Sequence, residues 1–204
     1  MKSNDEDPFV IAHKPVEDGF PFDLETDSLA DSLGLRLPNR SLYVVQGRVG
    51  GGKSLIAQRL TYGLVENDVK VLVITTELTT RGWIEQMESI GYGVTESIRE
   101  GRIMVISRFG TIAESRSDVM ISEVLDSPAV DMADVVIIDA ASALVPANLD
   151  ANERFLFMQK MRKIASQGRS IMMCIDPDEM DGRLLHSMRA AAEVVLDMQT
   201  AMIG

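Results

Sequence analysis

A glycine-rich segment between an apolar run and a helical pattern constrains this chain more than any other feature. The segment reads Gly47-Arg-Val-Gly-Gly-Gly-Lys53-Ser54 and matches the pattern G-x-x-x-x-G-K-[ST]. The apolar run 42–45 precedes it, and residues 55–60 follow with helical spacing of apolar positions. In a strand–loop–helix order, backbone N–H groups can surround phosphate oxygens, and the helix N-terminus adds partial positive charge. The sequence therefore predicts a site for a nucleoside triphosphate.

The residues of this loop have separate expected roles at the phosphates. Lys53 is long enough to reach the β- and γ-phosphates, and the Ser54 hydroxyl is suited to ligate Mg²⁺. The residues that we expect to contact the nucleotide are Gly47, Val49, Gly50, Gly51, Gly52, Lys53, Ser54 and Leu55. The alternative is a glycine-rich turn followed by a chance Lys-Ser pair, which leaves the flanking strand and helix patterns unexplained.

Composition narrows the class of protein. The 204 residues carry a net charge of −11, and 46% of them are hydrophobic, which is ordinary for one globular domain. The acidic balance argues against sequence-independent binding to nucleic acid or to an anionic membrane, because both need basic surface. No uncharged apolar stretch reaches the roughly 18–20 residues of a membrane helix, and no signal-peptide core follows Met1. We therefore expect a cytoplasmic protein without direct membrane insertion, with the single cysteine, Cys174, as a buried thiol.

Strand and helix patterns alternate from residue 41 onward. Strands are predicted at 41–46, 70–75, 103–107, 134–139, 170–175 and 193–199. Helices are predicted at 53–66, 79–90, 115–126, 151–167 and 182–192. Continuous apolar runs such as 71–74 and 135–138 are typical of parallel strands that are buried on both faces. The prediction is an α/β domain with a mostly parallel central sheet and helices on both faces.

The N-terminal residues have a different character. Residues 1–22 are acidic, hold three of the seven prolines and show no sustained period, so we expect a tail that is partly disordered or laid over the surface. Residues 23–204 would form the domain, beginning with a short helix that ends near Gly34. On the predicted helix 151–167, a buried face is expected to comprise Phe155, Leu156, Met158, Met161 and Ile164.

Two carboxylates end predicted strands beside the phosphate loop. Asp139 follows the apolar run 135–138, and we expect it to hold the Mg²⁺ shell together with Ser54. Glu77 follows the strand at 70–75, where it could orient or deprotonate an attacking water. The alternative for Glu77 is a capping or solvated acid at the start of the next helix.

Other charged residues are weaker candidates. The segment Asp176-Pro-Asp-Glu179 follows the strand at 170–175, but its proline suits a turn or helix start equally well. Arg183 and Arg189 lie on the next predicted helix, where solvated arginines are the ordinary case.

The order of these motifs resembles the RecA-like ATPases, specifically their KaiC-like branch. Within that branch, three stretches are similar to the family of the archaeal flagellum (archaellum) accessory protein H (FlaH/ArlH). They are Thr75-Thr-Glu-Leu-Thr-Thr-Arg-Gly-Trp-Ile-Glu-Gln-Met-Glu-Ser-Ile90, Val135-Val-Ile-Ile-Asp-Ala140, and Ile171-Met-Met-Cys-Ile-Asp-Pro-Asp-Glu-Met180 with the helix 184–190. The resemblance covers about residues 22–204.

This resemblance implies a RecA-like P-loop NTPase core that binds ATP and Mg²⁺. It further implies a cytoplasmic subunit of the archaellum motor, peripheral to the membrane, that docks with the motor ATPase and the membrane platform protein and forms a homo-oligomeric ring. KaiC-like hydrolases carry two adjacent glutamates where this chain has Thr76-Glu77, so we expect nucleotide-dependent assembly of the motor with slow hydrolysis at most. Members of the family continue past the strand at 193–199 into a further hairpin, and we expect that hairpin to be missing.

Three other functions compete with this interpretation. A genuine KaiC-like ATPase or autokinase in signalling would show turnover that depends on Glu77. A DNA recombinase needs a basic loop after Asp139, whereas residues 140–147 contain no Lys or Arg. A small-molecule kinase needs an arginine-rich lid, and no such segment is visible.

Overall fold

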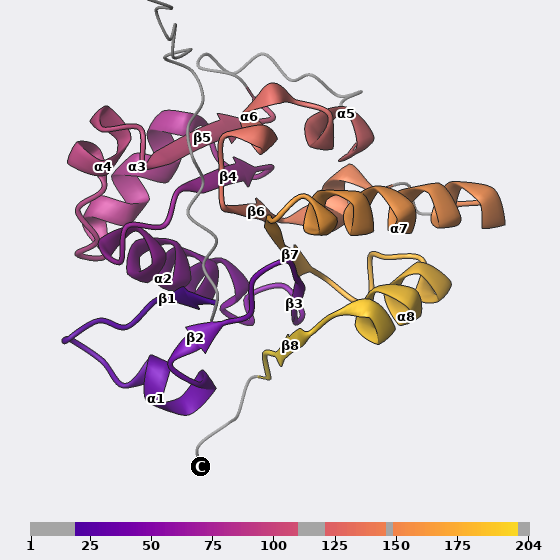
Figure 1. The fold of residues 1–204 in the computed structure, drawn as a ribbon, viewed down its shortest axis with the longest axis horizontal. Helices are drawn as coiled ribbons and strands as arrows, with labels where there is room; N and C mark the ends of the chain where they lie inside the picture. Colours follow the sequence, from indigo (N-terminus) through magenta and orange to yellow (C-terminus); the bar gives the residue numbers. More distant parts are fainter. Residues whose placement is uncertain (1–18, 110–120, 146–148, 200–204) are drawn as a thin grey trace, which may run out of the picture.

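The computed structural model describes residues 19–109, 121–145 and 149–199. Six parallel strands form the central sheet in the order β5-β4-β6-β7-β3-β8 (Figure 1). The strands are β3 (Leu42–Gln46), β4 (Val71–Thr75), β5 (Ile103–Ser107), β6 (Val135–Asp139), β7 (Ser170–Ile175) and β8 (Val194–Asp197). Each begins within one residue of its predicted start. The predicted parallel α/β sheet is therefore confirmed.

The strands separate two hydrophobic cores. Alternate residues of a strand point to opposite faces, so Val136 and Ile138 of β6 belong to one core while Val135 and Ile137 belong to the other. All five residues of β6 are buried, as are those of β3 and β4. Burial on both faces explains why these strands appear in the sequence as unbroken apolar runs.

Helices cover both faces of the sheet (Figure 1). One core includes side chains of α5 (Ile121–Leu125), α6 (Pro128–Asp131), α7 (Ala151–Ser166) and α8 (Gly182–Ala191). The other includes side chains of α1 (Leu29–Leu33), α2 (Lys53–Glu66) and α3 (Thr80–Ser89), with α4 (Thr95–Arg99) packed against it. Of the helix predicted at 115–126, α5 forms the last part, and residues 115–120 lie outside the described residues. The short elements α4, α6 and the 3-10 helix η1 (Ala141–Leu144) were not predicted.

The packed domain begins by residue 19, earlier than the predicted boundary at 23. Phe20 and Phe22 are buried in the core, and β1 (Phe20–Pro21) pairs antiparallel with β2 (Arg36–Leu37). The two phenylalanines pack into the core that includes α2. Prolines and acidic residues flank them in the sequence, and for this reason their burial was not predicted. Residues 1–18 of the predicted tail lie outside the described residues.

A bidentate ion pair ties this N-terminal segment to the helix after the phosphate loop. Arg59 of α2 donates from Nε and Nη2 to the two carboxylate oxygens of Asp27, at 2.5 and 2.7 Å, and from Nη1 to the carbonyl oxygen of Phe22 at 2.9 Å. The arginine side chain is 6% exposed. The pairing holds the pKa of Asp27 below its ordinary value, because the guanidinium favours the ionised carboxylate. The segment is therefore anchored to α2 rather than loosely laid over it.

The predicted buried face of α7 is partly wrong. Met158, Met161 and Ile164 are buried together with Phe157, but Phe155 and Leu156 are 62% and 51% exposed. At 3.6 residues per turn, Phe155 and Leu156 lie roughly 130° from the centre of the buried stripe. None of the described helices combines the length and apolar character needed to cross a lipid bilayer.

Candidate functional site

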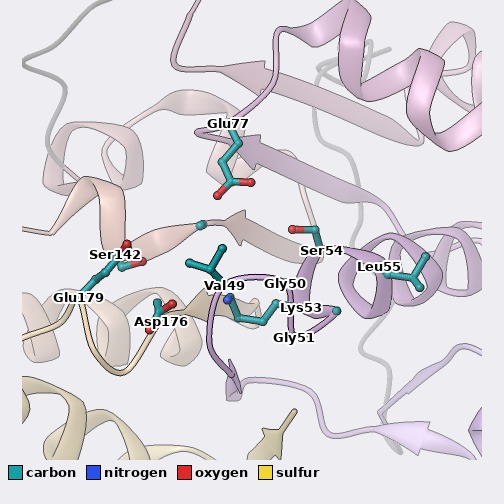
Figure 2. A pocket seen from close by; sticks show the side chains of 12 residues that line it. Val49, Gly50, Gly51, Lys53, Ser54, Leu55, Glu77, Ser142, Asp176 and Glu179 are labelled. Carbon is teal, nitrogen blue, oxygen red and sulfur yellow. Dashed lines mark hydrogen bonds between the residues drawn. The ribbon is translucent and has the colours of Figure 1, made fainter. Parts of the chain in front are cut away.

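The carboxyl ends of four adjacent strands meet at one edge of the sheet. The register aligns Thr75 of β4 with Asp139 of β6, and Gln46 of β3 with Ile175 of β7. Loops that leave these strand ends surround a pocket with a volume of about 330 Å³ (Figure 2). Its lining residues are Val49, Gly50, Gly51, Gly52, Lys53, Ser54, Leu55, Glu77, Ala140, Ser142, Asp176 and Glu179. Ligands of parallel α/β sheets bind at this edge.

The loop between β3 and α2 is folded into a tight hollow. The N–H group of Gly51 donates to the carbonyl oxygen of Arg48 at 2.9 Å. A Cβ at Gly51 would lie 2.9 Å from that same oxygen, so a larger residue does not fit. Gly50 and Gly52 have φ values of 74° and 88°, a left-handed region that favours glycine. Gly52 then serves as the N-cap of α2, so the open N–H groups of the helix start face the pocket region.

Lys53 extends over the loop at the floor of the pocket. Its Nζ donates to the carbonyl oxygens of Gly47 at 2.7 Å and Arg48 at 3.0 Å, and the residue is 9% exposed. These bonds hold the ammonium group beside the glycine hollow, and no carboxylate among the described residues hydrogen-bonds to it. An ammonium group held there is suited to compensate an anion.

Ser54 and Asp139 form a pair, although they are 85 residues apart in the chain. The Ser54 hydroxyl donates to Oδ1 of Asp139 at 3.0 Å, and Asp139 is 7% exposed. Burial raises the pKa of Asp139 to about 6, and the charge of Glu77 adds to this, whereas the Ser54 hydrogen bond and Lys53 oppose it. A hydroxyl and a carboxylate are the oxygen ligands that Mg²⁺ prefers, so the pair fits a divalent cation.

The adjacent residues Thr76 and Glu77 have different positions and different contacts. Thr76 is buried, and its hydroxyl bonds both the N–H and the carbonyl oxygen of Ala140, each at 3.0 Å. This ties the end of β4 to the residue that follows Asp139. Glu77 is exposed and lines the pocket, with its carboxylate directed into it (Figure 2). Glu77 therefore faces the same space as Lys53 and Ser54.

Not every candidate lines this pocket. Gly47 lines a second hollow of about 440 Å³, and Asp139 is hydrogen-bonded to Ser54 but is not among the residues that line the pocket. Arg183 is exposed and is not among the lining residues. Arg189 instead donates from Nε to Oε1 of Gln46 at 2.6 Å, which supports the end of β3.

Ala140 and Ser142 line the pocket but were not candidates from the sequence, and Glu179 was named only as the end of the weak candidate segment 176–179. The Ser142 hydroxyl on η1 donates to Oε2 of Glu179 at 3.3 Å, so the loops after β6 and β7 touch at the pocket. The only signal for Glu179 was its place in the acidic segment after a predicted strand, and Ser142 carried none. Asp176, a weak candidate, also lines the pocket and is 5% exposed.

Comparison with known proteins places the site in a family. The KaiC ATPase family matches residues 26–188. The chain is 30% identical over 185 residues to the archaeal flagellar ATP-binding protein FlaH of Methanocaldococcus jannaschii, a match that covers 89% of this chain and 78% of the relative. It is 26% identical to the protein of the same name from Methanococcus voltae, covering 89% and 80%.

A solved structure agrees with these sequence matches. The crystal structure of the flagellar accessory protein FlaH from Methanocaldococcus jannaschii superposes with a TM-score of 0.79 at 26% identity, covering 90% of this chain and 81% of that chain. The family match at residues 26–188 spans the glycine-rich loop, the strand that ends in Asp139 and the strands from β3 to β7. The chain therefore belongs to the KaiC family of ATPases and, within it, to the FlaH family of archaeal flagellar proteins.

Proposed function

We propose that this chain binds ATP with Mg²⁺ and acts as a nucleotide-controlled subunit of the archaellum motor. The relatives named above are described as flagellar and ATP-binding. The observation that carries the proposal is that Lys53 and Ser54 line one pocket beside the glycine hollow, with Asp139 hydrogen-bonded to Ser54. These three groups supply the cation, the hydroxyl and the carboxylate that a P-loop site uses to hold a metal–nucleotide complex.

Each residue has a defined part in this proposal. The N–H groups of residues 50–55 bind phosphate oxygens, and Lys53 exchanges its carbonyl partners for the β- and γ-phosphates. Ser54 and Asp139 would hold Mg²⁺, which would compensate the charge of the phosphates. Glu77 orients the attacking water. With Thr76 in place of a second glutamate, one carboxylate acts alone, so turnover is slow.

The proposed partners follow from the family and from surface charge. The chain would dock with the motor ATPase and the membrane platform protein on the cytoplasmic side of the membrane, and form a homo-oligomeric ring. Its net charge of −11 favours protein partners over nucleic acid. ATP binding would set which docking state is stable, since a ligand shifts an equilibrium only through different affinities for the two states.

A second function is a working KaiC-like ATPase or autokinase, and the direction of Glu77 into the pocket favours it. ATP affinity and turnover measured together separate the two proposals. Turnover below about 10⁻³ s⁻¹ with tight binding would support the assembly role, since this is the range of slow intrinsic GTPases. Turnover near about 1 s⁻¹ that collapses in Glu77→Gln would support the hydrolase.

Lys53→Ala tests the site itself. We expect this variant to lose ATP binding, while Lys163→Ala, which removes an exposed lysine of α7, keeps it. Tight binding by Lys53→Ala would refute the phosphate-loop assignment. In a pull-down with the motor ATPase, docking that is equal with and without ATP would show that the nucleotide has no control over assembly.

A further inference from the structure

Carboxylates outnumber cations around the phosphate pocket. Glu77, Asp176 and Glu179 all line it, and Lys53 supplies the single cationic side chain among its described lining residues. The Lys53 ammonium is also shared with two loop carbonyls. Coulomb repulsion between like charges grows with the charge of the ligand. Such a lining therefore opposes a third phosphate more than it opposes the first two.

Glu179 differs from the other two carboxylates in how it is held. Asp176 accepts a hydrogen bond from the N–H of Asp178 at 3.0 Å, which stabilises the turn after β7. Glu179 instead accepts from the Ser142 hydroxyl at 3.3 Å. Figure 2 shows this pair across the pocket from Ser54, with Glu77 on a third side. Ser142 has one hydroxyl proton, so it can donate either to Glu179 or to a ligand oxygen in the pocket.

We propose that Glu179 and Ser142 form a sensor for the third phosphate of the nucleotide. Ser54 would hold the metal that compensates the terminal phosphates, and because Ser54, Ser142 and Glu179 line the same pocket, a third phosphate would be expected between Ser54 and the Ser142–Glu179 pair. With a diphosphate bound, Ser142 donates to Glu179; with a triphosphate bound, Ser142 donates to the phosphate, and Glu179 is repelled from the pocket. This inference rests on the proposed nucleotide site.

The loop that carries Glu179 leads directly into a helix. Asp181, two residues further on, caps α8 by accepting from the N–H of Leu184 at 2.8 Å. Arg154 of α7 lies 3.9 Å from the same carboxylate. Movement of Glu179 therefore acts on the start of α8 and on its contact with α7. A change in the number of bound phosphates thereby alters the packing of α7 and α8 on one face of the sheet.

The test is the ratio of the affinities for Mg·ATP and Mg·ADP. Glu179→Gln keeps the size and a hydrogen-bond acceptor but removes the charge, so we expect the affinity for ATP relative to ADP to rise about tenfold, the effect that one neighbouring charge commonly has on an ionic equilibrium. In a Ser142→Ala background the same substitution should change the ratio less, because Glu179 is no longer held at the pocket.

Asp178→Asn is the matched control. It removes one charge from the same loop, but Asp178 is exposed, lies 3.2 Å from Arg48 and lines the second hollow rather than the phosphate pocket. We expect its ratio to stay within twofold of the wild type. Any of three results would overturn the sensor. The ratio could be unchanged in Glu179→Gln, it could change equally in Asp178→Asn, or the effect of Glu179→Gln could be the same in the Ser142→Ala background.

Failure of the sensor is distinguishable from failure of the nucleotide site. If the wild type binds the nucleotides, Lys53→Ala abolishes this binding and Glu179→Gln leaves the affinity ratio unchanged, only the sensor is overturned. Absence of ATP and ADP binding in the wild type overturns both proposals. Circular dichroism and thermal unfolding of each variant establish that the measured chain is folded.

Discussion

Replacing Asp139 by asparagine should stabilise the nucleotide-free protein at neutral pH. Asp139 is 7% exposed, and burial raises its pKa from 3.8 to about 6. The folded state therefore binds more protons than the unfolded state between these two values, and stability falls as pH rises through this window. The pKa rises by about two, and each pKa unit corresponds to about 1.4 kcal/mol, so ionised Asp139 lowers the free energy of unfolding by about 3 kcal/mol at pH 7. Asparagine keeps an oxygen acceptor for Ser54 and is never ionised, so it avoids this cost.

Urea unfolding of the metal-free protein at pH 4.5 and pH 7.5 measures the effect. Asp139→Asn should exceed the wild type by up to about 3 kcal/mol at pH 7.5, with a much smaller difference at pH 4.5. Asp31→Asn, which neutralises an exposed carboxylate on α1, controls for the change in net charge. A variant less stable than the wild type at pH 7.5, or a gap that is the same at both pH values, would refute the reasoning.

The same substitution should weaken the response to magnesium. If Asp139 helps to hold Mg²⁺, the gain in ATP affinity that Mg²⁺ produces in the wild type should be largely lost in Asp139→Asn. Isothermal titration with and without Mg²⁺ measures this gain. An undiminished gain would count against the metal role of Asp139, whatever the stability data show. A buried carboxylate that destabilises the empty protein yet binds metal would be a cost that function imposes on the fold.

Three further outcomes are expected. Asp27→Ala should lower the free energy of unfolding by about 2 kcal/mol, because buried Arg59 loses two hydrogen bonds, and a loss below about 0.5 kcal/mol in urea would contradict this. Cys174 should resist thiol reagents at pH 8 until the protein is unfolded, because its side chain is buried and burial raises the thiol pKa, so rapid native labelling would refute that burial. On α7, Phe155→Ser should cost less than about 0.5 kcal/mol and Met158→Ala about 2–3 kcal/mol, and equal losses would contradict the observed helix orientation.

Local patterns in the sequence were enough to predict the sheet and the glycine-rich loop between β3 and α2. Strand starts were predicted within one residue because a parallel strand buried on both faces is a contiguous apolar run. Shorter elements such as α4 were missed, since five residues hold too little of the helical period. The error on α7 has a similar origin. Apolar residues crowd one stretch of that helix, and composition does not say which of them the sheet contacts.

The sequence alone determined the loop of glycines, its lysine and its serine, because these residues are adjacent and their chemistry needs no other part of the chain. Only the tertiary structure decided which side chains surround this loop. Ser54 meets Asp139 across 85 residues, and Ser142 meets Glu179 across 37. These meetings depend on the strand order, which brings the ends of β3, β4, β6 and β7 to one edge. Strand order is set by how the helices bury both faces of the sheet, and no local spacing of residues encodes it.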